Sequence, residues 1–301
     1  MWFKNARVFQ LPTDFTIETD KLSEQLKDDA LKPCGSQDMS SQGWISPFSI
    51  NNDELYCLHS GNAQLITMAV EEKILPSMVV NQQLQEKVSQ IKSETGSKPG
   101  RKQQTDMKQE ILFDLLPQAF TKLKKVGAYI DNTHKIMIVD SASQNPAENV
   151  ISQLRQTLGS FKATAFGESS GMATVMTKWV TDGHAEGGLD FGSSIVLETL
   201  DEAKSVIRAK NVNYLTDEMQ RHIENGYLVT QIGLVLNDRI EFTLTHDFAV
   251  KSIKFTDIVL DQMDLETIDS EEQLMDSRFT LMSLELTELY NVLFNIFPKP
   301  E

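Results

Sequence analysis

Basic side chains concentrate in one stretch of this 301-residue sequence, residues 73–125. Ten lysines and arginines stand there against five acidic residues, so the stretch carries a charge of +5 within a chain of −15. Lysine and arginine bind polyanions by pairing with phosphates and releasing their counterions. This separation of charge predicts one surface that attracts a polyanion and another that repels it.

Residue patterns that support catalysis or hold a metal are absent from the sequence. It has no Walker loop, dinucleotide fingerprint, nucleophile elbow, zinc-ligand spacing or His-Glu-x-x-His. Cys34 and Cys57 lie far apart and are interpreted as buried free thiols, and the five histidines have no partner at metal-ligand spacing. Glu71 and Glu72 are interpreted as a solvated flank in preference to an acid/base pair. We therefore predict no catalytic residue, metal or cofactor; a hydrolase using scattered carboxylates is the weakest of three hypotheses.

Composition places the chain among ordinary globular proteins, with 40% hydrophobic and 24% charged residues. No apolar run approaches the roughly 18 residues of a membrane span. With two cysteines and no leader pattern, we expect a cytoplasmic protein that does not contact the membrane.

A projecting helical hairpin is predicted to carry the basic stretch. Val80, Leu84 and Val88 recur every four residues, which indicates an amphipathic helix over 77–91. Residues 95–104 hold two glycines, a proline and three basic residues and are expected to form an exposed loop tip before a second helix at 105–115. A charged hairpin is also compatible with simple solvation, without any partner.

The remaining elements predict an α+β fold with antiparallel sheets. Short strands joined by tight turns, without a helix between each pair, argue against a doubly wound sheet. Strands are expected at 3–11 and 64–70, two more within 191–209, a hairpin at 129–140 and a meander at 227–236, 239–245 and 250–256. Helices are expected at 20–30, at 216–225 and from an Asn145 cap to Gly159. Residues 174–183 are expected to form either a short helix or a strand.

The end of the chain shows the clearest helix. Ser270 and Gln273 form a capping box, and seven apolar positions from Met275 to Ile296 alternate in steps of four and three. Such a stripe fits either intramolecular core or a dimer seam. Residues 257–288 hold ten acidic groups against Arg278, which excludes this lobe as a surface for DNA.

Several stretches, in the same order along most of the chain, resemble one known family. They are residues 2–5, 33–39 (Pro-Cys-Gly-Ser-Gln-Asp-Met), 43–44, 71–76 (Glu-Glu-Lys-Ile-Leu-Pro), 115–117 with 119–120, 178–180 and 206–210. Their combination resembles the RdgC family of bacterial recombination-associated proteins. Each stretch alone would be weak, and the later part matches more by pattern than by residue.

The resemblance implies a non-enzymatic, nucleoid-associated protein that binds DNA. Its horseshoe-shaped subunits would pair into a homodimeric ring that encircles double-stranded DNA without sequence preference and limits RecA-promoted recombination. Whether the ring also binds single-stranded DNA is left undecided by the resemblance. The expected domains are a central one (1–75 with 121–180), a helical tip (76–120) and a base (181–301). The tip would form the openable contact through Phe120 and Leu116, and the C-terminal half the permanent one.

The same resemblance and the charge pattern nominate nine DNA-facing residues. They are Lys73, Lys98, Arg101, Lys102, Lys122, Lys124, Lys125, Arg208 and Lys210. Asn211 and Val212 depart from the family pattern, which has a further lysine and a polar residue there. The competing hypothesis is an acidic module that binds a recombination protein through its C-terminal lobe, with the basic hairpin merely solvated.

Overall fold

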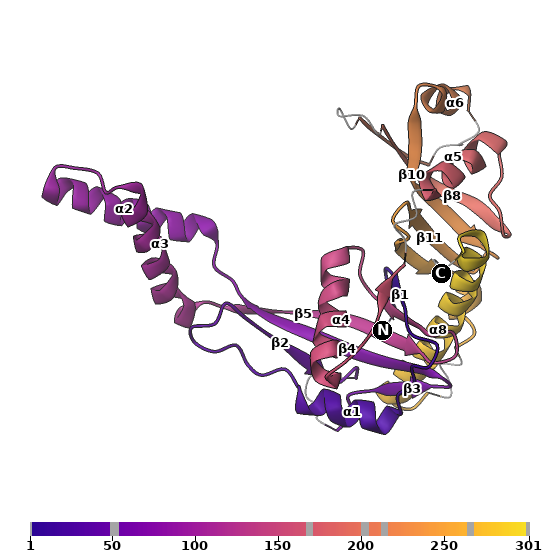
Figure 1. Ribbon diagram of the computed structural model, residues 1–301, viewed down its shortest axis with the longest axis horizontal. Helices are drawn as coiled ribbons and strands as arrows, with labels where there is room; N and C mark the ends of the chain where they lie inside the picture. Colours follow the sequence, from indigo (N-terminus) through magenta and orange to yellow (C-terminus); the bar gives the residue numbers. More distant parts are fainter. Residues whose placement is uncertain are drawn as a thin grey trace. The chain divides into compact units, whose positions relative to one another are not determined.

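The protein's computed structural model describes residues 2–48, 54–166, 171–199, 205–211, 216–263 and 268–298 (Figure 1). It is α+β with antiparallel strand pairs, as the sequence predicts. The chain divides into two compact units. Unit 1 comprises Met1–Asp28, Ser46–Thr67 and Val126–Glu301, and unit 2 comprises Asp29–Ile45 and Met68–Lys125.

Two long strands, β4 (Ala63–Lys73) and β5 (Thr121–Asp131), each begin in one unit and end in the other. Residues 63–69 and 127–131 are buried, whereas 70–73 and 121–126 are partly or fully exposed. They belong to a seven-stranded sheet with the order β2-β4-β5-β6-β1-β7, in which β3 pairs with β4. Its other strands are β1 (Arg7–Gln10), β2 (Ser40–Ile45), β3 (Leu58–Ser60), β6 (Ile136–Val139) and β7 (Thr164–Ala165).

A five-stranded sheet in unit 1 has the order β12-β11-β10-β8-β9. The predicted meander is confirmed as β10 (Tyr227–Leu236), β11 (Ile240–Thr245) and β12 (Val250–Phe255), and β8 (Leu189–Thr199) and β9 (Val206–Lys210) complete it. Ala6 and Val250 exchange two backbone hydrogen bonds of 2.7 and 3.0 Å. The segment before β1 is thereby tied to the first residue of β12.

The first strand is shorter than predicted because residues 3–5 bond elsewhere. Lys4 and Asn5 donate their backbone N–H groups to the Asp140 carboxylate at 3.1 and 2.9 Å, and Phe3 donates its own to Met282 Sδ at 3.1 Å. Burial raises the pKa of Asp140, an effect opposed by these N–H donors. Only four residues are left for strand pairing.

The helices of unit 1 follow the sequence pattern, with corrections at their ends. The N-cap of α4 is Ser143, two residues before the predicted cap Asn145, and the helix begins at Gln144. Pro146 is accepted there because the N–H groups of the first turn have no partner within the helix. The stretch predicted as helix or strand is helical. The helices are α1 (Thr19–Asp28), α4 (Gln144–Leu158), α5 (Met172–Asp182), α6 (Asp217–Glu224), α7 (Asp257–Leu260) and α8 (Glu271–Ile296).

The apolar stripe of α8 lies in the core of its own chain. Phe279, Met282, Leu286, Leu289 and Leu293 are fully buried, in a cluster that also contains residues of α5 and of both sheets. Ser270 accepts a hydrogen bond from the Gln273 N–H, as expected of its cap. Of the two interpretations of this stripe, intramolecular core is the one that the packing supports.

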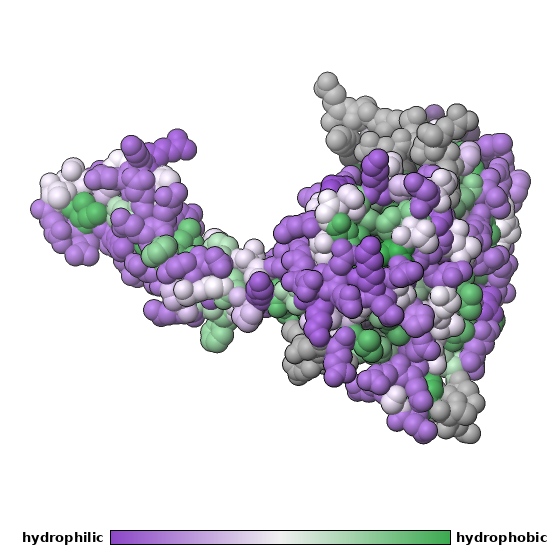
Figure 2. Space-filling view, turned by 60° about the horizontal axis from the view of Figure 1, so that its bottom comes forward, coloured by the Kyte–Doolittle hydropathy of each residue, from purple (hydrophilic) through white to green (hydrophobic). Residues whose placement is uncertain are grey.

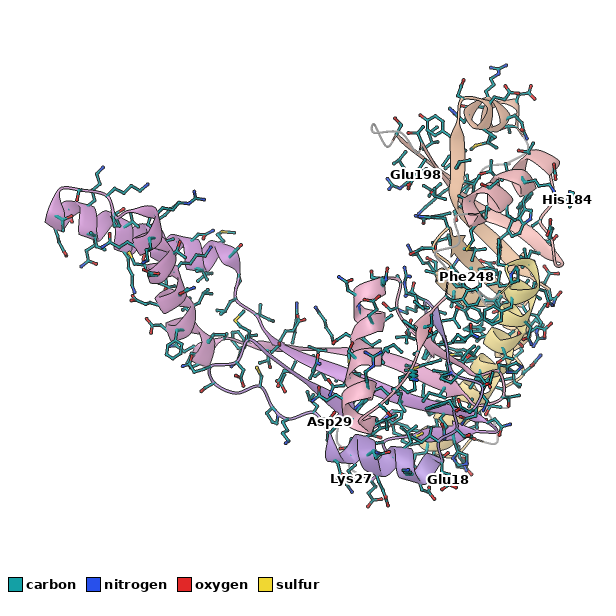
Figure 3. The ribbon with its side chains drawn as sticks, in the orientation of Figure 1. Glu18, Lys27, Asp29, His184, Glu198 and Phe248 are labelled. Atoms are coloured by element: carbon teal, nitrogen blue, oxygen red, sulfur yellow. The ribbon has the colours of Figure 1, made fainter. Side chains whose placement is uncertain are left out.

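Aromatic rings gather around Phe248, which Figure 3 labels next to α8. Its ring centroid lies 4.4 Å from that of Phe166, 5.9 Å from Phe294 and 6.2 Å from Tyr290. Phe248 is 1% exposed and has φ +59°, a conformation that costs a bulky residue about 1–2 kcal/mol. Packing of the ring therefore outweighs backbone strain at this turn.

Unit 2 contains β2, the outer ends of β4 and β5, and two helices, α2 (Ser77–Thr95) and α3 (Arg101–Leu115), followed by a 3₁₀ turn η1 (Leu116–Gln118). The Trp44 N–H donates to Asp29 O at 3.1 Å, and its carbonyl accepts from the Leu31 N–H. A Cβ on Gly43 would lie 2.6 Å from the Leu31 backbone, so only glycine fits there. This pairing ends the first helix at Asp28, two residues earlier than predicted.

None of the helices in the described ranges is both long and apolar enough to span a membrane.

Candidate nucleic-acid interface

Four of the nine nominated basic residues lie at the exposed ends of β4 and β5. Lys73 is the last residue of β4, and Lys122, Lys124 and Lys125 are exposed on β5. Just beyond the strands, the Ile74 N–H donates to the Phe120 carbonyl at 2.7 Å. The two strand ends therefore lie side by side and gather these four cations within unit 2. We call them the strand cluster.

Glu72 partly neutralises the strand cluster, a feature that the charge count did not reveal. Its carboxylate accepts Lys124 Nζ at 2.9 Å and Lys122 Nζ at 3.3 Å. The hydrogen bond from Lys124, with a smaller contribution from Lys122, lowers the pKa of Glu72, so it stays charged at neutral pH. Glu72 immediately precedes the basic stretch 73–125 and is therefore not one of its five acidic residues.

The Pro33–Met39 loop is attached to β4 beside the strand cluster. Glu71 Oε2 accepts the Cys34 N–H at 2.7 Å, and Lys73 donates its N–H to the Met39 carbonyl at 2.9 Å. The hydrogen bond from Cys34 lowers the pKa of Glu71. This shift favours the charged form of Glu71, whereas a general acid needs the opposite shift.

Lys98, Arg101 and Lys102 form a second group, the helix cluster, at the junction of α2 and α3. The prediction of a loop over 95–104 is wrong for half of that range, because α2 continues to Thr95 and α3 begins at Arg101, with Gly100 as its N-cap. All three side chains are exposed. No side chain caps the first turn, and cations there are disfavoured by the helix dipole, so a bound anion would satisfy both the cations and the free N–H groups.

The two predicted dimer contacts differ sharply in exposure. Phe120 is 84% exposed, whereas Leu116 is 6% exposed and has little surface to offer to a partner. Of eleven large apolar side chains that are exposed on the described chain, seven belong to unit 2, including Met78 and Phe113. Figure 2 shows hydrophobic residues among hydrophilic ones on the part that carries α2 and α3, at left. Phe120 is the most exposed of these side chains.

Arg208 and Lys210, the other two candidates, lie in unit 1 on β9. Both are exposed and alternate with Ala209, which packs against the core. Asn211 follows with φ +55° and donates its N–H to Ser193 O at 2.6 Å. Asparagine tolerates this left-handed conformation better than most residues, which accounts for one of the two departures from the family pattern. Val212, the other, lies outside the described residues.

Groups of three or more residues able to hold a metal ion were not found among the described His, Cys, Asp and Glu side chains. Of the two cysteines predicted to be buried, Cys57 is buried and Cys34 is half-buried. Burial, with a smaller effect of Asp20, raises the pKa of Cys57 to about 12, so this thiol is protonated at neutral pH.

Comparison with known proteins gives a consistent result over nearly the whole chain. A family model described as "RdgC: Putative exonuclease, RdgC" matches residues 1–299. Proteins named recombination-associated protein RdgC are 35% identical over 290 residues in Serratia proteamaculans (strain 568) and 36% identical over 292 residues in Salmonella paratyphi B and Salmonella typhimurium. Each alignment covers 96% of this chain and 95% of the relative. The chain therefore belongs to the RdgC family of recombination-associated proteins.

Proposed function

We propose that this protein is a non-enzymatic DNA-binding protein that encircles duplex DNA as a ring-shaped homodimer and limits RecA-dependent recombination. It would bind without sequence preference, through phosphates, and act at the nucleoid. The observation that carries the proposal is the position of the cations. In a chain of −15, seven of the nine candidate residues occupy two exposed clusters of unit 2.

Charge segregation explains how so acidic a protein would hold a polyanion. Acidic residues of α8 lie far along the sequence from the strand and helix clusters, and one of them, Glu285, is buried and paired with Arg239. Phosphate contacts fix a protein on a duplex but carry no sequence information, which fits binding along arbitrary DNA. Phe120 and its exposed apolar neighbours supply the proposed openable contact between tips.

A salt series with the wild-type protein tests the proposal. We expect it to bind a fluorescent duplex of arbitrary sequence, with log K falling linearly with log salt at a slope of about −0.9 per neutralised phosphate. Light scattering should report a dimer. Failure to bind at low salt would favour the acidic interaction module instead. Degradation of the duplex when Mg²⁺ or Mn²⁺ is added would contradict the non-enzymatic proposal and favour the exonuclease description of the family model.

Phe120→Ala is expected to weaken the tip contact. A large exposed aromatic side chain that inserts into a partner contributes about 2 kcal/mol or more, so the tip contact should weaken on the order of thirtyfold. Loading on circular duplex DNA and its retention after a salt jump report the openable contact. Leu55→Ala, at an exposed apolar position of unit 1, is the control. Unchanged dimerisation together with unchanged loading would exclude Phe120 as the anchor.

A further inference from the structure

One face of the five-stranded sheet is hollowed into a cavity of about 590 Å³. Ile195, Ile232 and Phe242 point from β8, β10 and β11 into the core. Ile195 and Phe242 also contribute to the lining of the cavity, together with polar neighbours such as Ser194 and Thr243. Polar and charged residues of the five strands therefore share one concave surface in unit 1 with apolar ones.

Two pairs of basic residues stand at opposite edges of this surface. Arg208 and Lys210 lie on the edge strand β9, and Lys251 and Lys254 lie on the other edge strand, β12. All four line the cavity. The edges are four strand steps apart, which at about 4.8 Å per step gives roughly 19 Å along the sheet. We call the two pairs the β9 rail and the β12 rail.

The surface of β8, β10 and β11 between the rails carries small and mostly uncharged side chains. Lys251 stands opposite Thr243, Thr243 opposite Gly233, and Lys210 opposite Ser194. A Cβ on Gly233 would lie 2.9 Å from Ser194 Oγ, so this position accepts no larger side chain without a shift. Small residues in the middle let a bulky ligand approach the backbone while its charges meet the rails.

Two carboxylates oppose the β12 rail. Glu241 lines the cavity and holds Lys254 Nζ at 3.5 Å, but both side chains are more than half exposed, so this pair is weak. Asp247 interacts electrostatically with Lys251, but its main partners are Thr245 and Arg7. Burial raises the pKa of Asp247, and the hydrogen bonds from Thr245 and Arg7 outweigh this effect, so the pKa is lowered. The cavity lining thus keeps four cations against one carboxylate.

We propose that this face is a second phosphate-binding site for duplex nucleic acid, in which the β9 and β12 rails each follow one backbone strand. The inference rests on the proposed function and adds Lys251 and Lys254, with Glu241 as an opposing charge. A duplex presents two rows of phosphates, whereas a single strand presents one and would leave a rail unmatched. The wide separation of the rails therefore selects the duplex.

The test compares Lys251→Gln/Lys254→Gln with wild type on one duplex and on one of its single strands. Two lost phosphate contacts would reduce the salt slope by about 1.8 and weaken duplex binding on the order of tenfold or more near about 0.1 M salt. Single-strand binding should change less. Glu241→Gln, which removes the opposing charge at the same place, should tighten duplex binding and serves as the matched variant of opposite sign.

The outcomes separate this inference from the function on which it rests. If wild type binds the duplex and the double variant keeps the same affinity and slope, the sheet site is excluded while the proposed function stands. An equal loss on single strands would overturn the two-rail arrangement. If the wild-type protein itself fails to bind the duplex, both the sheet site and the proposed function are contradicted. All substituted side chains lie on the solvent side of the sheet, and an unchanged thermal unfolding curve would confirm intact folding.

Discussion

Replacing Lys98, Arg101 and Lys102 together with glutamine is expected to reduce the salt slope of duplex binding by up to about 2.7 and the affinity by about two orders of magnitude near about 0.1 M salt. The three residues are exposed cations at one helix junction and form no ion pair with another described residue. Glutamine keeps most of the side-chain length and helix propensity, so charge is the property removed. Anisotropy of a labelled duplex across a salt series measures both quantities.

Glu72→Gln supplies the control of opposite sign. It releases Lys122 and Lys124 from their shared carboxylate, so duplex binding should tighten and the slope should steepen. If the triple variant leaves the slope unchanged while Glu72→Gln steepens it, the strand cluster binds phosphate and the helix cluster does not. An effect in neither variant would remove unit 2 from the interface.

Phe248→Ala is expected to destabilise unit 1 by about 3–5 kcal/mol, the usual cost of truncating a buried phenylalanine. Its ring contacts Phe166, Tyr290 and Phe294, so the truncation opens a cavity between the turn after β11 and α8. Alanine also keeps a Cβ at φ +59°, so no backbone strain is relieved. Urea unfolding followed by circular dichroism gives the free energy of unfolding.

Two further variants separate packing from backbone conformation. Phe248→Gly loses the same ring but accepts the positive φ, so it should be no less stable than Phe248→Ala despite the usual cost of glycine. Leu284→Ala, at a position on α8 that is 62% exposed, should change the free energy of unfolding by less than about 0.5 kcal/mol. A loss below about 1 kcal/mol for Phe248→Ala would contradict the assigned role of the aromatic cluster.

The elements that the sequence predicted well are those with a strong local signal. The α8 stripe with its Ser270 cap, the β10–β12 meander and the helix predicted over 216–225 all follow from local patterns, within a few residues. The start of α3 was missed because no capping side chain precedes Arg101, and glycine at an N-cap is easily taken for a loop residue. The end of α1 was missed because a tertiary contact, with Trp44, sets it.

The features of the candidate site likewise divide into those with a local sequence signal and those set by tertiary contacts. Local charge density located the basic stretch, and both unit 2 clusters lie within it. The pairing of Glu72 with Lys122 and Lys124 joins residues about 50 positions apart, and no periodicity reports such a contact. Lys251 and Lys254 sit in an ordinary alternating strand, and only the order of strands in the sheet places them opposite Arg208 and Lys210.

The hydrogen bond between Ile74 and Phe120 has a consequence for how this chain can vary. It closes residues 75–119 into a loop whose two ends are held together by neighbouring strands. Closing a long loop costs little more than closing a short one, since the entropy grows only with the logarithm of length. A change in the length of the α2–α3 segment should therefore alter the free energy of folding little, so the sequence between Ile74 and Phe120 can vary while β4 and β5 remain paired.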